Sequence, residues 1–374
     1  MTDLGAPSPR RVLALEPWLG GSHRAFLEGW RARSRHALEV VGLPDRHWKW
    51  RMRAGAWELA RTVGDGPPPD ALCVSDYIDL PALYGFLPPS WSDVPALVYF
   101  HENQLTYPVQ GPAKQRDSGY GFTNILSCLR AKRVVFNSRF HREEFGAAAR
   151  GLLDRLPTPN PLEELEAALA ASAVVAPGVD LEALPLGAGP ADGPLRVLFA
   201  HRWEHDKDPT AFLQAARDAR RLGAEFELIL LGETYDAQPD GVEELLAELT
   251  PSIAHRGFLP SRAAYAEALG GCDLAVSTAR HEFFGIGIVE ALAAGVTPLV
   301  PRRLSYPEVV GEELGGDVLY SAADELIRQL VEHAADPKPL RARDHREALR
   351  RRAATWSCDR SAEQLDDLVD DLLR

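Results

Sequence analysis

Short apolar runs alternate with longer segments of helical periodicity along most of this chain. A first series of apolar runs covers residues 11–15, 38–42, 71–75, 96–100, 133–137 and 173–176, and a second covers residues 195–200, 227–232, 274–277, 297–300 and 317–320. Near-continuous apolar strands separated by helices are typical of parallel sheets that are covered on both faces. The pattern therefore predicts an α/β protein with two doubly wound parallel-sheet domains and a cleft between them.

The stretch between the two series, residues 177–194, is rich in Pro, Gly and Ala and is predicted to be a linker. We expect an N-terminal domain over residues 8–183 and a C-terminal domain over residues 194–345. In the remaining segment, residues 346–374, apolar residues recur at helical spacing over 361–373. This segment is expected to form a helix that packs back across the domains.

The size and composition agree with this division. A chain of 374 residues is too long for one ordinary hydrophobic core. A content of 45% hydrophobic and 25% charged residues describes a soluble globular protein. The formal net charge of −13 argues against broad, nonspecific nucleic-acid binding but leaves room for a local basic patch.

Cysteine spacing and terminal composition bear on the cellular compartment. The four cysteines are widely separated and form no metal-ligand pair, so buried thiols in a reducing cytoplasm are the simplest account. The first ten residues are polar, and the apolar run at 12–15 is too short for a signal peptide. Since no apolar run reaches transmembrane length, we expect a cytoplasmic protein without a membrane anchor.

Residues 278–301 carry the most informative pattern. Glu282 precedes a turn that bears Gly285 and Gly287, and the helix-like run that follows carries a second acid, Glu290. Such a turn exposes backbone N–H groups at a helix start, where the helix dipole favours anions. Two carboxylates beside an anion site suit a ligand with both phosphates and hydroxyls, such as a nucleotide sugar.

The alternative interpretation of this segment is an amphipathic helix that exposes Glu290 to solvent. Two glutamates eight residues apart also occur by chance. The helix is apolar on nearly all sides, however, and this predicts that it is buried. A buried carboxylate needs partners, which favours a binding site.

A second charged segment follows the predicted strand at 195–200. Arg202 and Lys207 lie between that strand and a helix, with Asp208 as the predicted cap and Pro209 in the first turn. Two cations at the carboxyl end of a strand can hold a diphosphate, Arg as a fork and Lys as a point charge. The alternative is a solvated loop, but the acidic helix described above favours diphosphate binding.

Three glycine-bearing segments are weaker candidates, since each can be a plain turn. Gly20 and Gly21 stand between the first strand and a helix, where glycine lets the backbone approach a ligand closely. Gly232 ends another predicted strand. The third segment, which can line a nucleobase pocket, comprises Gly257, Phe258 and Leu259.

A polar cluster follows the apolar run at 96–100. It comprises His101, Glu102, Asn103, Gln104 and Tyr107. Ligands of doubly wound sheets sit at the carboxyl ends of the strands, where this cluster lies. A lone histidine is more often a core or surface residue than a catalyst, but His101 has polar company at the ligand edge.

One segment is strongly basic and aromatic in an otherwise acidic chain. Its candidate contact residues are Arg46, His47, Trp48, Lys49, Trp50 and Arg51. Nucleic-acid bases stack on tryptophan, and lysine or arginine contacts phosphate. The residues favour equally the start of an amphipathic helix whose tryptophans pack inward.

In combination, the Gly20–Gly21 turn, His101, the Arg202–Lys207 pair and the Glu282–Glu290 motif resemble glycosyltransferases of the GT-B architecture, in the large retaining family four. This resemblance implies two Rossmann-like domains facing a central cleft, with the donor bound mainly by the C-terminal one. Such enzymes need no metal, because cations and helix termini replace it.

The resemblance also implies roles for individual residues at the donor. Arg202 and Lys207 would hold the diphosphate, Glu290 the ribose hydroxyls, and Glu282 and His101 the transferred sugar. The backbone amides that would cradle the phosphates and the sugar are those of Gly285, Ile286, Gly287 and Ile288.

Over about residues 10–145 the chain is similar to the queuosine-tRNA mannosyltransferase group. The similar segments include Pro-Trp-Leu-Gly-Gly-Ser-His-Arg, Tyr-Phe-His-Glu-Asn-Gln-Leu-Thr-Tyr-Pro and Tyr-Gly-Phe-Thr-Asn-Ile-Leu-Ser. This similarity implies GDP-mannose as donor and the cyclopentene diol of queuosine in a tRNA anticodon as acceptor. The basic segment from Arg46 to Arg53 would then contact RNA, with Asn103, Gln104 and Tyr107 also on the acceptor side.

The resulting hypothesis is transfer of mannose with retention of configuration, in which positive groups stabilise the leaving diphosphate. Alternatives are a different donor with a small-molecule, glycan or lipid acceptor, an epimerase or phosphorylase on the same fold, and a catalytically silent nucleotide-sugar-binding module. A dinucleotide oxidoreductase is disfavoured, because no Gly-x-Gly-x-x-Gly follows the first strand.

Overall fold

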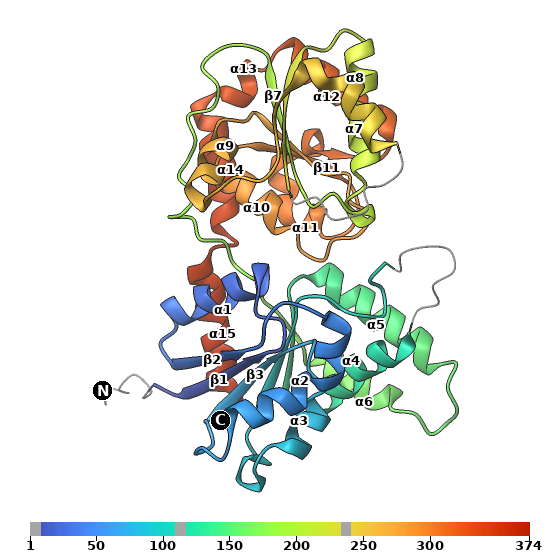
Figure 1. The fold of residues 1–374 in the computed structure, drawn as a ribbon. Coiled ribbons are helices and arrows are strands. Elements are labelled where there is room, and N and C mark those ends of the chain that lie inside the picture. Colours follow the sequence, from blue (N-terminus) through green and yellow to red (C-terminus); the bar gives the residue numbers. More distant parts are fainter. Residues whose placement is uncertain (1–8, 109–116, 233–240) are drawn as a thin grey trace. The chain divides into compact units, whose positions relative to one another are not determined.

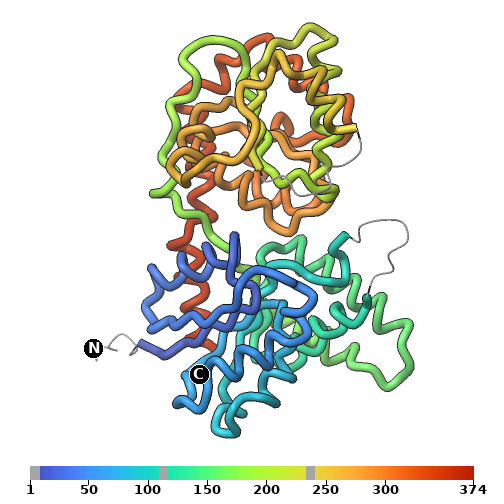
Figure 2. The backbone as a smooth tube through the Cα atoms, viewed as in Figure 1, coloured from blue at the N-terminus to red at the C-terminus, as the bar shows by residue number. Residues whose placement is uncertain are grey.

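The computed structural model describes residues 9–108, 117–232 and 241–374. The backbone divides into an N-terminal unit, Met1–Gly178 with Cys358–Arg374, and a C-terminal unit, Val179–Ser357. The chain passes into the second unit after Gly178 and returns after Ser357, a path that the colours of Figure 2 follow. Residues 346–374, which the sequence analysis treated as one terminal segment, are thus divided between the two units.

Six parallel strands form the sheet of the N-terminal unit, in the order β2-β1-β3-β4-β5-β6. The strands are β1 (Arg11–Glu16), β2 (Ala37–Gly42), β3 (Ala71–Ser75), β4 (Ala96–Phe100), β5 (Arg133–Phe136) and β6 (Ala173–Val174). The helices are α1 (Gly21–Arg33), α2 (Trp48–Val63), α3 (Leu80–Phe86), η1 (Pro89–Trp91), α4 (Ser118–Arg130), α5 (Arg139–Leu153), α6 (Leu162–Ala170) and α15 (Cys358–Leu372). Helices cover both faces of the sheet, as predicted (Figure 1).

Alternation of side chains explains why these strands read as continuous apolar runs. In β1, Leu13 and Leu15 enter the core that contains residues of α2 to α6, whereas Val12 and Ala14 enter the core shared with α1 and α15. All four side chains are buried. A strand with a hydrophobic core on each side has no face left for polar residues.

The C-terminal unit repeats this architecture with the strand order β12-β11-β10-β7-β8-β9. Its strands are β7 (Leu195–Ala200), β8 (Phe226–Leu231), β9 (Ile253–Arg256), β10 (Leu274–Val276), β11 (Thr297–Pro301) and β12 (Leu319–Tyr320). The helices are η2 (His205–Lys207), α7 (Pro209–Arg221), α8 (Val242–Leu249), η3 (Thr250–Ser252), α9 (Arg262–Gly270), α10 (Ile286–Ala293), α11 (Tyr306–Val310), η4 (Glu312–Leu314), η5 (Gly316–Val318), α12 (Ala323–Ala335), α13 (Lys338–Arg341) and α14 (Arg343–Ala354). Two doubly wound parallel sheets were predicted, and both are present.

One strand, β9, was not among the predicted strands. It lies at the edge of its sheet and pairs only with β8 among the described strands. Its side chains alternate between half-buried and exposed, and two of its four residues, His255 and Arg256, are polar. An edge strand of this kind has no apolar run by which a sequence pattern can identify it.

Most of the predicted linker is bound to the C-terminal unit by two arginines of α14. Arg346 is buried and donates hydrogen bonds to four carbonyl groups, one of which is that of Gly187. Arg350 donates to the carbonyl groups of Leu181 and Leu184. Backbone hydrogen bonds also hold this segment, from the N–H of Gly187 to the carbonyl oxygen of Ala294 and from the N–H of Gly189 to that of Gly270.

The four cysteines are free thiols and are buried, as expected. Within the described ranges, the structure has no helix whose length and apolar character would suffice to cross a membrane.

The terminal helix α15 packs against α1 in the N-terminal unit, and the two helices lie side by side in Figure 1. Asp366 of α15 is 2% exposed and accepts three hydrogen bonds of 2.7 Å, from Trp30 Nε1, Ser34 Oγ and the backbone N–H of Arg35. This carboxylate therefore joins the last helix of the chain to the first.

Replacing Asp366 with alanine leaves three donors without their acceptor, of which Trp30 Nε1 is buried and the other two are partly buried. We expect Asp366→Ala to lower the free energy of unfolding by about 2–5 kcal/mol. The neighbouring Asp367 is 66% exposed and pairs with Arg35 at the surface, so Asp367→Ala should cost about 0.5 kcal/mol or less. Denaturant unfolding of both variants tests this difference, and equal losses would show that Asp366 is not the joining group.

Candidate active site

The segment between β7 and α7 has the geometry that its sequence predicts. Asp208 caps α7, since its Oδ1 accepts a hydrogen bond from the N–H of Ala211 at 3.3 Å, and Pro209 occupies the first turn. Asp208 has a φ of +47°, in the left-handed region. The cap reverses the chain so that η2, with Lys207 at its end, lies at the carboxyl end of β7.

Lys207 is the centre of a partly buried charge cluster. Its Nζ donates to the carbonyl oxygen of His281 at 3.0 Å and to Glu282 Oε2 at 3.1 Å, and lies 3.2 Å from Asp206 Oδ2. The side chain is only 11% exposed. Two hydrogen bonds and one ion pair thus surround the ammonium group. The structure brings together Lys207 and Glu282, which the sequence analysis placed in one site.

Electrostatics in this cluster keep both partners charged. Burial opposes the charge of Lys207, but the carboxylates of Glu282 and Asp206 outweigh it and raise the Lys207 pKa. Burial likewise opposes the charge of Glu282, yet the Lys207 cation, with smaller contributions from His201 and His281, lowers the Glu282 pKa. Burial, reinforced by Lys207, lowers the pKa of His201 to about 4, so this ring is neutral at physiological pH.

Arg202, the other predicted diphosphate ligand, is more accessible. Its side chain is 47% exposed, and its Nη1 lies 3.3 Å from Glu204 Oε2. An exposed arginine paired with a carboxylate can turn toward an incoming anion at small cost.

The start of α10 supplies N–H groups close to this cluster. Gly285 is the N-cap, with a φ of +88°, and a Cβ there would stand 3.0 Å from the ring of Tyr306. A Cβ on Gly287 would lie 3.8 Å from the carbonyl oxygen of Ala200 at the end of β7. Glycine is favoured at the first position by its backbone conformation, whereas at the second a Cβ would make only an ordinary van der Waals contact.

The amides predicted to cradle the donor differ in availability. The N–H of Ile288 donates to the carbonyl oxygen of Gly285 at 3.0 Å, inside the first turn. Those of Ile286 and Gly287 have no acceptor within the described part of the chain, as is usual at a helix start. These two N–H groups are the ones that an anion can use.

Glu290 has the partners that its burial requires. Its carboxylate is 13% exposed and accepts from Arg262 Nη2 at 2.6 Å and from the Tyr265 hydroxyl at 2.8 Å. Both donors belong to α9, which the sequence analysis did not single out. The expectation that this helix is largely buried and that its carboxylate has partners is confirmed.

The remaining predicted donor residues of this unit lie in two turns. Gly232 has a φ of +134°, and a Cβ there would stand 2.1 Å from the carbonyl oxygen of His201, so close packing of two strand ends requires this glycine. Gly257 follows β9 with a φ of +129°, and a Cβ there would meet no atom of the described residues within 4 Å. Phe258 is 72% exposed and Leu259 is half-buried.

In the N-terminal unit, Gly20 and Gly21 start α1. A Cβ on Gly20 would overlap the Asp45 side chain, which explains that glycine by packing. Gly21 has a φ of +48°, and a Cβ there would meet no described atom within 4 Å, so its backbone is accessible.

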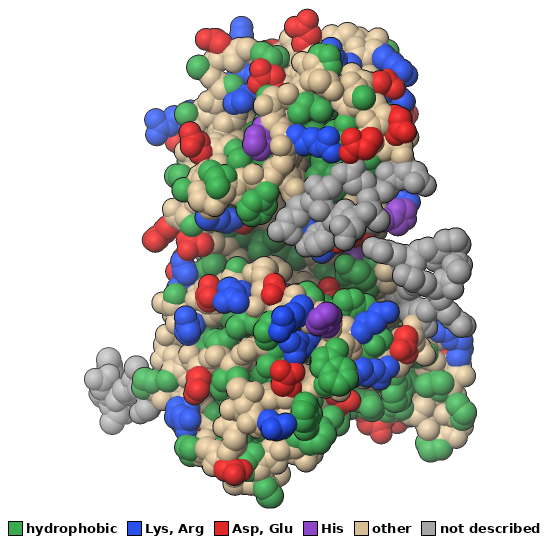
Figure 3. Space-filling view, in the orientation of Figure 1, with side chains coloured by type: hydrophobic (Ala, Val, Ile, Leu, Met, Phe, Trp, Pro, Cys, Tyr) green, Lys and Arg blue, Asp and Glu red, His purple; other side chains and the backbone are tan. Residues whose placement is uncertain are grey.

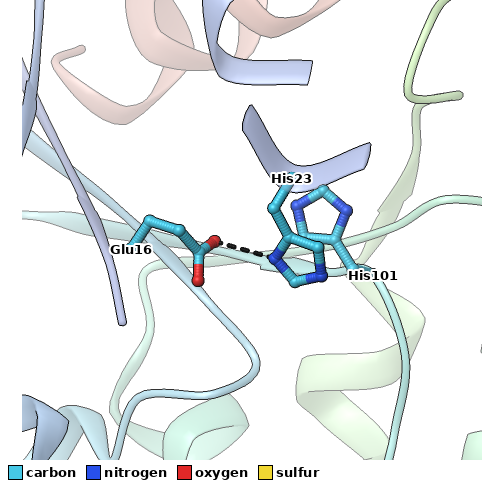
Figure 4. A group of neighbouring side chains, drawn as sticks. All are labelled: Glu16, His23 and His101. Atoms are coloured by element: carbon cyan, nitrogen blue, oxygen red, sulfur yellow. Dashed lines mark hydrogen bonds and ion pairs between the residues drawn. The ribbon is translucent and has the colours of Figure 1, made fainter. Parts of the chain in front are cut away.

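His101 lies just beyond β4, and its main chain is fixed on both sides. Its N–H donates to Asp76 Oδ1 at 2.8 Å, and its carbonyl oxygen accepts from Asn137 Nδ2 at 2.8 Å. The ring stacks on His23 at 3.9 Å between centroids (Figure 4) and contacts the rings of Phe26 and Tyr99.

The polar residues after His101 shape their own loop. Asn103 is fully buried, and its Oδ1 accepts from the N–H groups of Leu105 and Thr106, so this side chain builds a turn. Gln104 is 9% exposed and donates to Glu102 Oε1 at 2.8 Å. Tyr107 is half-buried.

The basic and aromatic segment opens α2, with His47 as an N-cap in the left-handed region. Arg51 is buried and bonds Glu58 at 2.6 Å, so it supports the helix from within. The other candidates face solvent: Arg46, His47, Trp48, Lys49 and Trp50. The alternative in which both tryptophans of this segment pack inward is wrong, since Trp48 is 36% and Trp50 is 58% exposed.

One face of α2 is also basic and aromatic. Trp50, Arg53, Trp57 and Arg61 follow each other at spacings of three and four residues, and all are exposed. We call these four residues the α2 stripe. Arg61 lies 5.0 Å from the centre of the Trp57 ring, and Arg53 lies 4.3 Å from that of Tyr120. Figure 3 shows basic and hydrophobic side chains together on the face that α2 occupies in Figure 1.

Sequence reasoning missed a second group at the carboxyl ends of β1 and β4. Glu16 ends β1 and His23 lies on α1, and Glu16 Oε2 is 3.1 Å from His23 Nδ1 (Figure 4). Both side chains are buried. The sequence does contain a sign of this group, because Glu16 is the last residue of an apolar strand and a buried glutamate requires a partner.

Two family models match this chain, one over each of its two units. Residues 11–179 match the family model described as tRNA-queuosine alpha-mannosyltransferase N-terminal, and residues 187–356 match that of glycosyl transferases group 1. The chain is 32% identical over 340 residues to the tRNA-queuosine alpha-mannosyltransferase of Drosophila melanogaster, an alignment that covers 88% of each chain. It is 26% identical to a GDP-mannose-dependent alpha-(1-6)-phosphatidylinositol dimannoside mannosyltransferase of Mycobacterium tuberculosis, covering 92% of this chain and 87% of that one.

Solved structures share the fold at lower identity. Anabaena HepE in complex with UDP superposes with a TM-score of 0.69 at 16% identity, covering 96% of this chain and all of the other. The sucrose-phosphate synthase of Thermosynechococcus elongatus gives 0.71 at 17% identity, covering 97% and 99%. These likenesses establish the GT-B glycosyltransferase fold. Together with the matches across both units, they show that the chain is a glycosyltransferase and belongs to the tRNA-queuosine alpha-mannosyltransferase family.

Proposed function

We propose that this enzyme transfers mannose from GDP-mannose to queuosine in tRNA with retention of configuration. The observation that carries the proposal is the partly buried Lys207–Glu282 pair beside the start of α10, in a chain of this family. A cation, carboxylates and helix N–H groups are the chemistry that a sugar diphosphate requires.

Donor binding by this cluster involves an exchange of partners. The Lys207 ammonium group is already surrounded by two hydrogen-bond acceptors, His281 and Glu282, and an ion-pair partner, Asp206, so we expect a phosphate oxygen to displace one of them. A carboxylate released in this way is free to accept a hydrogen bond from a sugar hydroxyl. The proposal therefore gives Glu282 two successive partners, Lys207 without the donor and the mannose with it.

Arg202 and the N–H groups of Ile286 and Gly287 complete the proposed phosphate contacts. Arg202 is exposed enough to turn toward the diphosphate. Glu290 keeps lone pairs for the ribose hydroxyls, since a carboxylate offers about four acceptor positions and two are used by Arg262 and Tyr265. In this proposal positive side chains and helix N–H groups do the work of a metal ion.

In the proposed reaction, the bond between the anomeric carbon and the β-phosphate oxygen breaks, and GDP leaves as an anion. The acceptor hydroxyl oxygen forms the new bond on the same face of the sugar. Its proton passes to the leaving phosphate oxygen. Lys207, Arg202 and the α10 amides stabilise the negative charge that develops on the diphosphate, which is the main catalytic task. His101 is proposed to hydrogen-bond a hydroxyl of the reacting sugars.

The α2 stripe supports a tRNA acceptor. Exposed tryptophans are stacking surfaces for unpaired bases, and the arginines between them contact phosphates. The proposal extends the predicted contact, which covered the segment from Arg46 to Arg53, to Trp57 and Arg61. A tRNA substrate also implies that the enzyme works in the cytoplasm.

The proposal is tested by incubating the enzyme with GDP-, UDP- or ADP-linked sugars and tRNA that contains or lacks queuosine. Mass spectrometry of the digested nucleosides should show one added hexose on queuosine, with GDP-mannose only. Transfer to queuosine-free tRNA or to a glycan would replace the acceptor in this proposal. GDP binding without transfer to any acceptor would favour a catalytically silent binding module.

Loss of the buried cation should slow transfer strongly. Lys207→Ala removes a charge-assisted contact of about 1.5–3 kcal/mol, or roughly a 10- to 150-fold lower kcat/KM for GDP-mannose. Lys338, an exposed lysine of the same unit, provides the control, and Lys338→Ala should leave kcat/KM unchanged. A folded Lys207→Ala enzyme with wild-type kinetics would remove Lys207 from the donor site.

The α2 stripe should affect the acceptor and not the donor. Stacking is worth about 1–3 kcal/mol per base, so Trp50→Ala and Trp57→Ala should each weaken tRNA binding by roughly 5- to 150-fold. Filter binding of labelled tRNA measures this, and the KM for GDP-mannose should not move. Phe86→Ala is the matched control, because Phe86 is 55% exposed on α3 of the same unit. Equal losses in all three variants would deny the stripe a specific role.

A further inference from the structure

Glu16, His23 and His101 form a compact group with one carboxylate and two imidazoles (Figure 4). Such a set can in principle bind a metal ion, whose bond to an imidazole lies in the plane of the ring. The rings of His23 and His101 are 3.9 Å apart between centroids, and their planes differ by only 26°. Lone pairs in two nearly parallel planes do not converge on one ion, so the arrangement is that of a stacked pair.

The carboxylate of Glu16 is placed to hold a proton on one ring of this stack, that of His23. Its Oε2 lies 3.1 Å from His23 Nδ1, while its Oε1 accepts from the N–H of Trp18 at 2.9 Å and from Ser75 Oγ at 3.0 Å. Glu16 is 2% exposed and His23 is 7% exposed. Both oxygens of the carboxylate are therefore satisfied, and the ion pair is shielded from water.

In the described part of the chain, the ring of His101 is held by contacts with other aromatic rings. His23 stacks on it, Phe26 meets it edge-on at 5.0 Å, and Tyr99 lies 4.7 Å away. In the described part of the chain its ring nitrogens have no hydrogen-bond partner, whereas its main chain is bonded to Asp76 and Asn137. A ring that is fixed in place with unused nitrogens is prepared to meet a ligand.

We propose that His23, held as an imidazolium by Glu16, is a positioning residue that fixes the ring of His101 and keeps that ring neutral. A neutral imidazole can accept a hydrogen bond from a hydroxyl, whereas an imidazolium cannot. This inference rests on the proposed function, in which His101 meets a hydroxyl of the reacting sugars. It adds Glu16 and His23 to the machinery around that contact.

The charged groups near the stack agree with this assignment. Burial by itself would lower the pKa of His23, but Glu16, helped by Asp76 and Glu102, raises it to about 9. Burial and repulsion from His23 and His141 lower the pKa of His101 well below its usual range. The Tyr77 ring meets His23 edge-on and adds no charge at neutral pH.

The protonation of His101 can be followed without substrate, by NMR titration of ¹³C-labelled histidine side chains. The His101 signal is identified by its loss in His101→Gln. In the wild-type enzyme we expect no titration of this ring between about pH 5.5 and 8. In His23→Asn, which removes the neighbouring cation, the His101 midpoint should rise, and the acid limb of kcat/KM should rise with it. An unmoved His101 midpoint would overturn the proposal.

Two further variants separate this role from a structural one. Glu16→Gln keeps the polar contacts to Trp18 and Ser75 but weakens the hold on the proton, so it should shift the His101 midpoint in the same direction. It also carries the test if His23→Asn fails to fold. His36→Asn is the control, because His36 is buried to the same degree and bonds α15 instead. It should lower the melting temperature and leave the His101 titration unchanged.

The ion pair between Glu16 and His23 should also make the stability of the fold depend on pH. The His23 pKa is raised from 6.5 to about 9, so its contribution is complete below pH 6.5 and is lost as the pH rises through 9. The melting temperature of the wild-type enzyme should fall over that range, and His23→Asn should lack this fall. Absence of transfer in the wild-type enzyme would contradict the proposed function alone, since neither the titration nor the melting uses a substrate.

Discussion

A buried ammonium group is stable only where carboxylates or carbonyl groups surround it, and Lys207 satisfies this condition through Asp206, Glu282 and His281. The contact joins two segments that are more than seventy residues apart in the chain. One segment follows β7, and the other leads into α10. The charge pair therefore fixes where the start of α10 lies relative to the end of β7, and the geometry of the proposed phosphate contacts depends on it.

The N-terminal unit also contains a buried charge that needs a partner, but there the partner is a histidine. Glu16 closes β1 in a buried position, and its partner is the imidazole of His23. A histidine partner has a flat face as well as a charge, so it can also support the ring of His101 by stacking. In both units the buried charges gather at the carboxyl ends of parallel strands. The apolar strands end there, and loops can bring side chains from distant elements together.

The elements that the sequence predicted well are those with a local cause. Apolar strands such as β1 and β7 are recognisable because both faces are buried, and the cap of α7 follows from Asp208 and Pro209 alone. The missed features have distant causes. Glu290 is bonded by Arg262 and Tyr265, which belong to another helix. The edge strand β9 has no apolar run. A sequence pattern can indicate that a carboxylate is buried and therefore needs a partner, but it does not identify the partner residue.

The acidic balance of the chain constrains how the proposed tRNA substrate can be held. Exposed charges act over about one Debye length, roughly 8–10 Å, so the formal net charge of −13 repels phosphate near the surface except where basic side chains gather. Stacking acts only at contact and depends little on net charge, so tryptophans between arginines can hold bases where long-range attraction is lacking. Only unpaired bases present their faces for stacking. An α2 stripe that binds in this way selects a loop over a duplex, and a modified anticodon nucleotide lies in such a loop.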